Sequence, residues 1–256
     1  MKVRAKPKIA FFDFAGCEGC QLTVLDALQT HPELLDVVEI VQFREAMSEK
    51  GDNYQVAFVE GSYTRREDRE RLQSIREHAQ IVIALGACAH LGGVNAMRNW
   101  GPQEEIRHYV YREFARVHDS DHARPISSAI PVDGFIPGCP IDRDEFVAAV
   151  RQLLQGRIPE IPDYPVCVEC RLQEIPCLFM QGKLCLGPIT RAGCGSICPA
   201  HGQSCLGCRG QVTQANFQGL QAAAGEYRLD RALVEERLKF FQSDRLLNSE
   251  GAGDGR

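Results

Sequence analysis

Short apolar runs recur along the first half of the chain and are separated by amphipathic stretches. The runs lie at residues 8–14, 38–43, 54–60, 81–85 and about 132–138. They are too short for helices, contain many β-branched and aromatic residues, and stop at glycine or polar residues, which predicts strands. The first run, KIAFFDF, is apolar at both alternating positions and predicts a strand buried on both faces.

The stretch after the first run has helical spacing. Leu22, Leu25 and Leu28 recur three residues apart, which predicts a helix with these leucines on one buried face. Cys17 and Cys20 precede the leucines and are therefore expected in a loop that leads into the helix N-terminus. Such a position favours anions, including thiolate-bound clusters.

Later stretches complete an alternation of strands and helices. A charged helix is predicted from Thr64, with Thr64 and Glu67 as its capping box, and another helix is predicted over residues 142–156. Residues 99–130 are polar and show no clear period. The alternation predicts an α/β fold, in which residues 1–157 form a flavodoxin-like domain with a doubly wound parallel sheet.

Residues 158–256 do not continue this alternation. They contain eight cysteines within 42 residues, with prolines distributed among them. This composition predicts a cysteine-rich, loop-dominated domain, and a helix is expected at its C-terminal end. Hydrophobic residues make up 44% of the 256-residue chain and charged residues 25%, a balance that allows two modest globular domains.

Charge and local motifs exclude several classes of protein. The net charge of −5 is spread without long runs of one sign, so nucleic acid is not an expected partner. The N-terminus lacks a charged-then-apolar leader, and no apolar run approaches about eighteen residues. The sequence therefore predicts a cytoplasmic protein without a direct membrane anchor. It contains no nucleophile elbow, Walker loop or dinucleotide glycine motif, so no complete active site is expected.

The eight clustered cysteines predict bound metal. A reducing cytoplasm disfavours disulfides, and a zinc module would show tight Cys-x-x-Cys pairs separated by a longer knuckle. Irregular spacing with interspersed prolines suits 4Fe-4S clusters better. By chain order the ligands divide into Cys167, Cys170, Cys177 and Cys185, followed by Cys194, Cys198, Cys205 and Cys208. Loops can exchange ligands between two such sites.

The other four cysteines are Cys17, Cys20, Cys88 and Cys139. Each follows a predicted strand and has a glycine within two residues. Parallel sheets bind ligands beyond the carboxyl ends of their strands, and glycine lets the backbone approach a bulky cluster. These thiols therefore predict a third four-cysteine site. Glu60 follows another strand end, where we expect either a solvated or helix-capping acid or a carboxyl group that holds a proton beside the cluster.

An ordered set of motifs covers nearly the whole chain. The motifs are GCEGCQLTVLDAL at residues 16–28, VEGS at 59–62, GACAHLGGV at 86–94 and GCP at 138–140, followed by PVCVECRL, CLGPITRAGC and CLGCRG in the second half. Together they resemble the small, electron-transferring subunit of NiFe hydrogenases. Within that family the chain looks like the cytosolic, multisubunit group, in particular the delta subunits of the NAD(P)-linked sulfhydrogenases.

Departures from related branches support this placement. Cys167 stands where the respiratory, membrane-attached branch has a histidine ligand, and Cys198 adds a fourth thiolate where that branch often has a three-iron cluster. The related small subunit of the respiratory quinone reductase would show adjacent cysteines at the first motif, whereas two residues separate Cys17 from Cys20.

The resemblance implies three 4Fe-4S clusters in a relay. The proximal cluster, nearest the NiFe centre of a separate large subunit, would be held by Cys17, Cys20, Cys88 and Cys139. The distal cluster would be held by Cys167, Cys170, Cys177 and Cys185. The medial cluster would be held by Cys194, Cys198, Cys205 and Cys208.

The implied function is electron transfer during reversible oxidation of hydrogen by the large subunit. Electrons would pass to flavin- and iron–sulfur-containing reductase subunits, with NAD(P), a deazaflavin or a disulfide reductase as alternative acceptors. A zinc-stabilised interaction module and a free-standing ferredoxin-like carrier are the alternatives of other classes. His90 and His201 are candidates for hydrogen bonds to cluster sulfur, although each is as readily a loop histidine that faces water.

Overall fold

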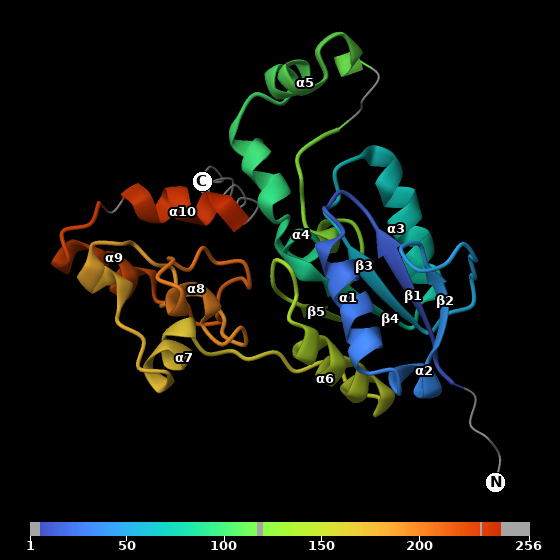
Figure 1. Ribbon diagram of the computed structural model, residues 1–256. Helices are drawn as coiled ribbons and strands as arrows, with labels where there is room; N and C mark the ends of the chain where they lie inside the picture. The colour runs from blue at the N-terminus through green and yellow to red at the C-terminus, as the bar shows by residue number, and fades with distance from the viewer. Residues whose placement is uncertain (1–5, 117–119, 231, 242–256) are drawn as a thin grey trace, which may run out of the picture.

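A single five-stranded parallel sheet organises the first half of the chain (Figure 1). The computed structural model describes residues 6–116, 120–230 and 232–241. The strand order is β2-β1-β3-β4-β5, and every neighbouring pair is parallel. The strands are β1 Lys8–Asp13, β2 Glu39–Phe43, β3 Val56–Glu60, β4 Ile81–Leu85 and β5 Gly134–Ile136. This is the order of a flavodoxin-like sheet, so the predicted fold class is confirmed.

Helices cover both faces of the sheet (Figure 1). One face packs against α1, α2 and α6, and the other packs against α3 and α4 together with a short 3₁₀ helix, η3. Their bounds are α1 Gly19–Thr30, α2 Leu34–Val37, α3 Arg66–His78, α4 Gly86–Leu91, η3 Ile126–Ser128 and α6 Arg143–Leu154. The alternation of strands and helices in the sequence therefore corresponds to three layers of structure.

Strand β1 shows why the sheet is buried on both sides. Ile9 and Phe11 belong to the core beneath α1 and α6, whereas Ala10 and Phe12 belong to the core beneath α3. Successive strand residues point to opposite faces, so a run that is apolar throughout fills both cores. The ring of Phe11 stacks on that of Phe58, with centroids 5.0 Å apart, and these rings anchor the first core.

The buried face of α1 differs from the prediction. Cys20, Val24 and Ala27 are buried, whereas Leu22 is 56% exposed. Leu25 and Leu28 pack only partly against the core. A helix turns by about 3.6 residues, so positions four and then three residues apart hold one face better than three successive steps of three. The small side chains at 20, 24 and 27 let α1 lie close to the sheet.

The predicted capping box of α3 is also wrong. The helix begins at Arg66, and the carboxylate of Asp68 accepts from the backbone N–H groups of Arg65 and Thr64 at 3.0 and 3.4 Å. Glu67 instead pairs with the Arg65 side chain at 3.2 Å. Because the helix starts two residues after Thr64, the third helical residue is Asp68, and its side chain reaches back to the free N–H groups.

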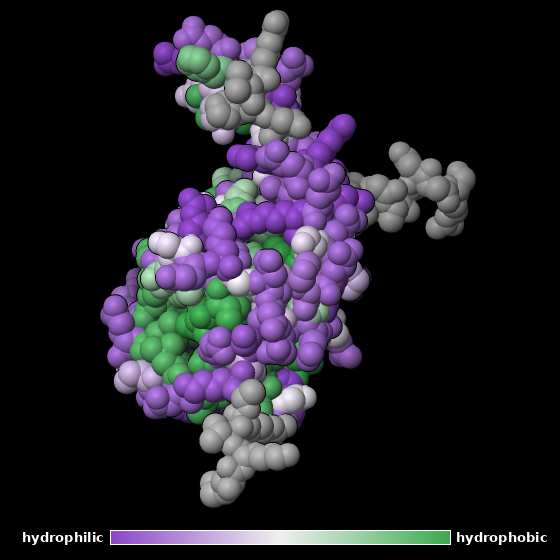
Figure 2. Space-filling model, turned by 90° about the vertical axis from the view of Figure 1, so that its right-hand side faces the viewer, coloured by the Kyte–Doolittle hydropathy of each residue, from purple (hydrophilic) through white to green (hydrophobic). Residues whose placement is uncertain are grey.

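The segment without a clear period forms an excursion from the sheet. Its elements are η1 Val94–Trp100, α5 Gln103–Tyr111 and η2 Arg112–Arg116. Helix α5 has no buried residue, which explains the missing periodicity, and Tyr109 and Phe114 are exposed. The excursion stands clear of the body, with hydrophilic and hydrophobic residues mixed on its surface (Figure 2).

The cysteine-rich region lies beside the sheet and contains short elements joined by loops (Figure 1). These are α7 Val166–Leu172, η4 Leu178–Gln181, α8 Ile197–Ala200, α9 Phe217–Glu226 and α10 Ala232–Phe241. The predicted C-terminal helix corresponds to α9 and α10, and α10 packs back against η1. The boundary after residue 157 stays a prediction. No helix in the described ranges has both the length and the apolar character needed to cross a membrane.

Candidate functional site

Four thiols gather beyond the carboxyl ends of β1, β4 and β5. We call Cys17, Cys20, Cys88 and Cys139 the sheet-edge set. Burial raises the pKa of Cys20, and the neighbouring groups Cys88 and Cys139 raise it further. Burial likewise raises the pKa of Cys88 to about 12, with contributions from Cys139 and Cys17. The structure thus brings together the four thiols that the sequence singled out. Their role as ligands stays a prediction.

Two of these cysteines lie in helices and not in loops. Cys20 occupies the first turn of α1, and Cys88 lies within α4, which follows β4 directly. The reason is that β4 ends at Leu85 and a helix starts at once, with Gly86 at φ 82 making the bend. A Cβ at Gly86 would clash with Sγ of Cys20, so glycine is required there for the close approach as well.

Glu60 supports the sheet-edge set from beneath. Its side chain is 4% exposed and accepts hydrogen bonds from the backbone N–H groups of Cys20 and Gln21 at 3.1 and 3.2 Å. It is therefore neither a solvated acid nor a capping partner for the helix at residue 64, because it caps the N-terminus of α1. Burial raises the pKa of Glu60, and these hydrogen bonds oppose that rise.

Asn95 ties the loops of the sheet-edge set together. Its Nδ2 donates to the carbonyl of Ala15 at 2.7 Å and to Oγ of Ser62 at 2.9 Å, and it lies 4.0 Å from Sγ of Cys88. Gly93 has φ 60, and a Cβ there would lie 2.7 Å from the same sulfur. The backbone therefore approaches this thiol as closely as the chain allows.

A second group of thiols lies at the far end of the cysteine-rich region. We call Cys167, Cys170, Cys177 and Cys185 the outer set. Burial raises the pKa of Cys167 to about 12, and the other three thiols raise it further. All four line one cavity of about 310 Å³. The N–H of Gly187 donates to Sγ of Cys185 at 3.4 Å.

The third group lies between the other two. We call Cys194, Cys198, Cys205 and Cys208 the middle set. Burial raises the pKa of Cys208 to about 12, and its thiol neighbours are Cys194, Cys198 and Cys139 of the sheet-edge set. A cavity of about 380 Å³ is lined by the whole middle set and by Cys139.

Contacts between the sets give them a spatial order. Cys139 and Cys208 link the sheet-edge set to the middle set. Cys205 donates its backbone N–H to Sγ of Cys185 at 3.2 Å, which links the middle set to the outer set. The outer set precedes the middle set in the chain but lies beyond it in space.

The donor sets fit four-iron clusters better than single metal ions. All twelve cysteines are free thiols. Within residues 6–116, 120–230 and 232–241, no three Cys, His, Asp or Glu side chains are placed so that they could share one ion. Ligands of a cubane bind different irons and so need not meet at a point. Bound iron would favour the thiolate form that burial opposes.

Sequence reasoning missed the polar side chains that hold the cysteine loops. Glu169 accepts from the N–H groups of Gly193 and Ser196 at 2.7 and 2.9 Å, and so connects the outer set to the loop of the middle set. Arg209 forms a two-pronged ion pair with Glu145, 64 residues away. No local pattern identifies such partners, because each pair forms only when distant segments meet.

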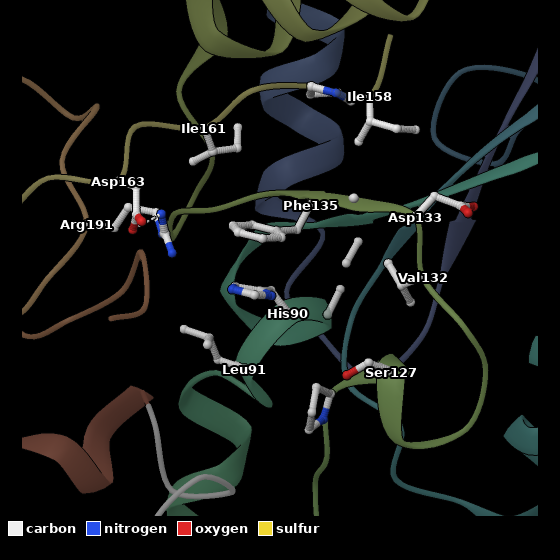
Figure 3. Close-up of a pocket in the computed structure, with 15 residues that line it drawn as sticks. His90, Leu91, Ser127, Val132, Asp133, Phe135, Ile158, Ile161, Asp163 and Arg191 are labelled. Carbon is white, nitrogen blue, oxygen red and sulfur yellow. Dashed lines mark hydrogen bonds and ion pairs between the residues drawn. The ribbon is translucent and has the colours of Figure 1, made fainter. Parts of the chain in front are cut away.

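The largest cavity is separate from the thiols. It has a volume of about 640 Å³, and its lining residues include no cysteine. The His90 ring stacks on that of Phe135, with centroids 3.8 Å apart, and the Arg191–Asp163 ion pair lies at the cavity's side (Figure 3). His201 Nδ1 lies 2.9 Å from the carbonyl oxygen of Ile197. Hydrogen bonds from His90 or His201 to cluster sulfur stay predictions.

Comparison with known proteins gives the family. Residues 17–153 match the model of the family described as NADH ubiquinone oxidoreductase, 20 Kd subunit. The chain is 33% identical over 235 residues to sulfhydrogenase 2 subunit delta of Pyrococcus furiosus, covering 91% of this chain and 98% of that protein. The chain belongs to this family and is a hydrogenase subunit. The resemblance read from the motifs is therefore confirmed.

Two further matches agree with this family membership. The hydrogenase subunit is 33% identical over 259 residues to an F420-non-reducing hydrogenase component, of the vhu type, from Methanocaldococcus jannaschii, covering 87% of this chain and 90% of that one. It also resembles a chain in the solved structure of an NAD+-reducing NiFe hydrogenase, with 28% identity and a TM-score of 0.55. That match covers 62% of this chain and 96% of the other.

Proposed function

We propose that this hydrogenase subunit relays electrons between the NiFe site of a large subunit and a reductase subunit. Three 4Fe-4S clusters would supply the one-electron carriers when bound. The sheet-edge set would hold the proximal cluster, the middle set the medial cluster and the outer set the distal cluster. The chain's own part is to hold each group of four thiols at fixed positions and to exclude water from it.

The observation that carries this proposal is the row of three four-thiol groups. Neighbouring groups are joined by Cys139 beside Cys208 and by Cys205 beside Cys185. A row of closely spaced sites is what stepwise electron transfer needs. Storage of metal or a purely structural role would not require the groups to touch in sequence from one end to the other.

Exposed apolar side chains at both ends support contact with partner subunits. Leu22 and Met97, on elements beside the sheet-edge set, are 56% and 44% exposed. Leu172 and Met180, beside the outer set, are 80% and 73% exposed. Exposed large apolar side chains that gather near a site are typical of protein interfaces. The large subunit would cover the sheet-edge end, and a flavin- and iron–sulfur-containing reductase would cover the outer end.

Geometry also favours clusters over the alternatives. A zinc-stabilised interaction module would need ligands that converge on single ions, and the described residues offer no such group. A free-standing ferredoxin-like carrier has little use for a three-layer sheet domain built around one site. An NAD(P)-linked acceptor agrees with the NAD+-reducing hydrogenase neighbour. A deazaflavin or a disulfide reductase is the alternative acceptor. A cytoplasmic location without a direct membrane anchor completes the proposal.

Anaerobic purification tests the proposal. We expect about twelve iron atoms per chain, all in four-iron clusters, together with a nickel-containing partner that co-purifies. Iron near eight atoms per chain, or a three-iron EPR signal in anaerobic material, would contradict the three four-iron clusters. Colourless protein with stoichiometric zinc would support the interaction module instead.

A further inference from the structure

Arg209 is the largest side chain that is fully buried in the described residues. Its exposed fraction is 1%, although arginine is rarely buried without a partner. It follows Cys208 directly and lines the cavity shared by the middle set and Cys139. A charged group in this place must be held by several acceptors, and their identity shows what the residue connects.

Each acceptor of Arg209 belongs to a different segment at the junction of the two sites. Nε donates to the carbonyl of Ala192 at 2.8 Å, and one terminal nitrogen donates to the carbonyl of Pro137 at 3.1 Å. Pro137 lies two residues before Cys139, and Ala192 lies two residues before Cys194. One side chain therefore bonds to the loops of two cysteines and is itself attached to a third.

The remaining bonds fix this side chain to the sheet region. Its two terminal nitrogens donate to the carboxylate of Glu145, on α6, at 2.6 and 2.9 Å. Gly193 has φ 107, and a Cβ there would clash with the guanidinium, so the loop passes over the pair only as glycine. Burial lowers the pKa of Arg209, but the hydrogen bonds and charge of Glu145 outweigh that effect and raise it. The guanidinium is therefore permanently positive.

We propose that Arg209 is a positioning residue that fixes the separation of the sheet-edge and middle sets and places a permanent positive charge beside the middle set. This inference rests on the proposed electron relay. Electron transfer between two centres falls steeply with their separation, so a bond network that spans both sites sets the rate of that step. A buried cation also stabilises the more negative, reduced state of a neighbouring centre and so raises its reduction potential.

Three variants separate position from charge. Arg209→Lys keeps the charge but loses the fork that reaches two loops and a carboxylate. Glu145→Gln keeps the arginine but weakens its anchor on α6. The double variant Glu145→Met/Arg209→Met replaces the pair with apolar side chains, which buried ion pairs often tolerate without loss of folding. Arg191→Lys is the matched control, because Arg191 pairs with Asp163 at 2.6 Å and bonds to no cysteine loop of the sheet region.

The measurements use the anaerobically purified hydrogenase complex. Iron content shows whether each variant retains its clusters. EPR redox titration gives the potential of each cluster, and the magnetic coupling between clusters reports their separation without any turnover. Hydrogen-dependent reduction of the acceptor is compared with hydrogen–deuterium exchange, which needs only the partner's NiFe site.

We expect Arg209→Lys to keep its iron and potentials, to change the coupling between the two clusters, and to slow acceptor reduction by about tenfold relative to exchange. The double variant should also lower the potential of the middle cluster, whereas Arg191→Lys should match the wild type. If the double variant does not assemble, Arg209→Lys and Glu145→Gln decide the question by the coupling alone. Wild-type coupling and potentials in variants that retain iron would overturn the role of Arg209. A wild-type complex without a middle cluster would instead overturn the proposed relay.

Discussion

The sheet region and the cysteine-rich region are held together by different means. In the sheet region, helices of 12 or 13 residues cover two continuous apolar cores. In the cysteine-rich region, the helices that carry thiols have seven residues or fewer, and the core between them includes Cys185 and Cys205 themselves. Burial of apolar surface is thus sufficient for one region, whereas the other depends on what its thiols bind.

Removal of iron should separate the two regions most strongly. An anaerobic chelator applied to the isolated chain is expected to unfold residues 158–216, because short loops lose the links that hold them. The strands β1, β3 and β4 should remain folded on their own cores. Amide hydrogen exchange followed by mass spectrometry measures both outcomes at once. Equal loss of protection in the two regions, or full protection in both, would contradict the comparison.

A cavity in the aromatic core should have the next largest effect. Phe58 is 1% exposed, and its ring lies 5.0 Å from that of Phe11 and 5.5 Å from that of Phe146. Phe58→Ala is expected to lower the unfolding free energy of the iron-free chain by about 3–5 kcal/mol. Urea denaturation measures the change. Phe114→Ala, at a position that is 59% exposed, is the control and should change it by less than about 0.5 kcal/mol.

Loss of one thiol should have different consequences in the two regions. Cys88→Ser removes a member of the sheet-edge set, so hydrogen oxidation should fall about 10–100-fold with every acceptor, dyes included. Cys170→Ser removes a member of the outer set, so reduction of the physiological acceptor should fall more than hydrogen–deuterium exchange. Only variants that co-purify with their partners and keep the iron of their other sites are compared. Equal loss of exchange and acceptor reduction in Cys170→Ser would show that its assignment to the exit of the relay is wrong.

The smallest effect concerns a helix cap that lies wholly within the sheet region. The side chain of Asp142 accepts from the N–H of Glu145 at 2.8 Å and caps α6. Asp142→Ala should lower the unfolding free energy by about 1 kcal/mol, because one N–H at the helix end loses its acceptor. Thermal unfolding of the isolated chain measures this. An unchanged iron content in the same sample would show that the cap acts on the sheet region alone.

The sequence predicts the sheet well because each strand carries its own signal. All five predicted strands form, and the thiols of Cys17, Cys88 and Cys139 meet because parallel strands end at one edge. The predicted buried face of α1 is wrong because leucine alone does not reveal which side meets the sheet. Arg209 and Glu169 escape sequence reasoning because each joins segments far apart in the chain, and a single sequence shows no sign of such contacts.

Thiol spacing in the second half predicts chemistry but little of the path of the chain. The two groups of four follow from chain order, and the contacts among their members agree with that division. Their spatial order does not follow from it, because the chain goes to the far end first and then returns to the middle. No periodic pattern of apolar residues records this reversal, since loops and not regular elements carry it.

The return of the chain has a consequence for how the protein is made. In a growing chain, the sheet-edge set is complete once Cys139 is synthesised, and the outer set once Cys185 has followed. The middle set needs Cys208 and is completed last. A ribosome that stops shortly after Cys185 would therefore release a chain with both terminal groups of thiols and nothing between them. Early termination interrupts this protein at its centre instead of shortening it from one end.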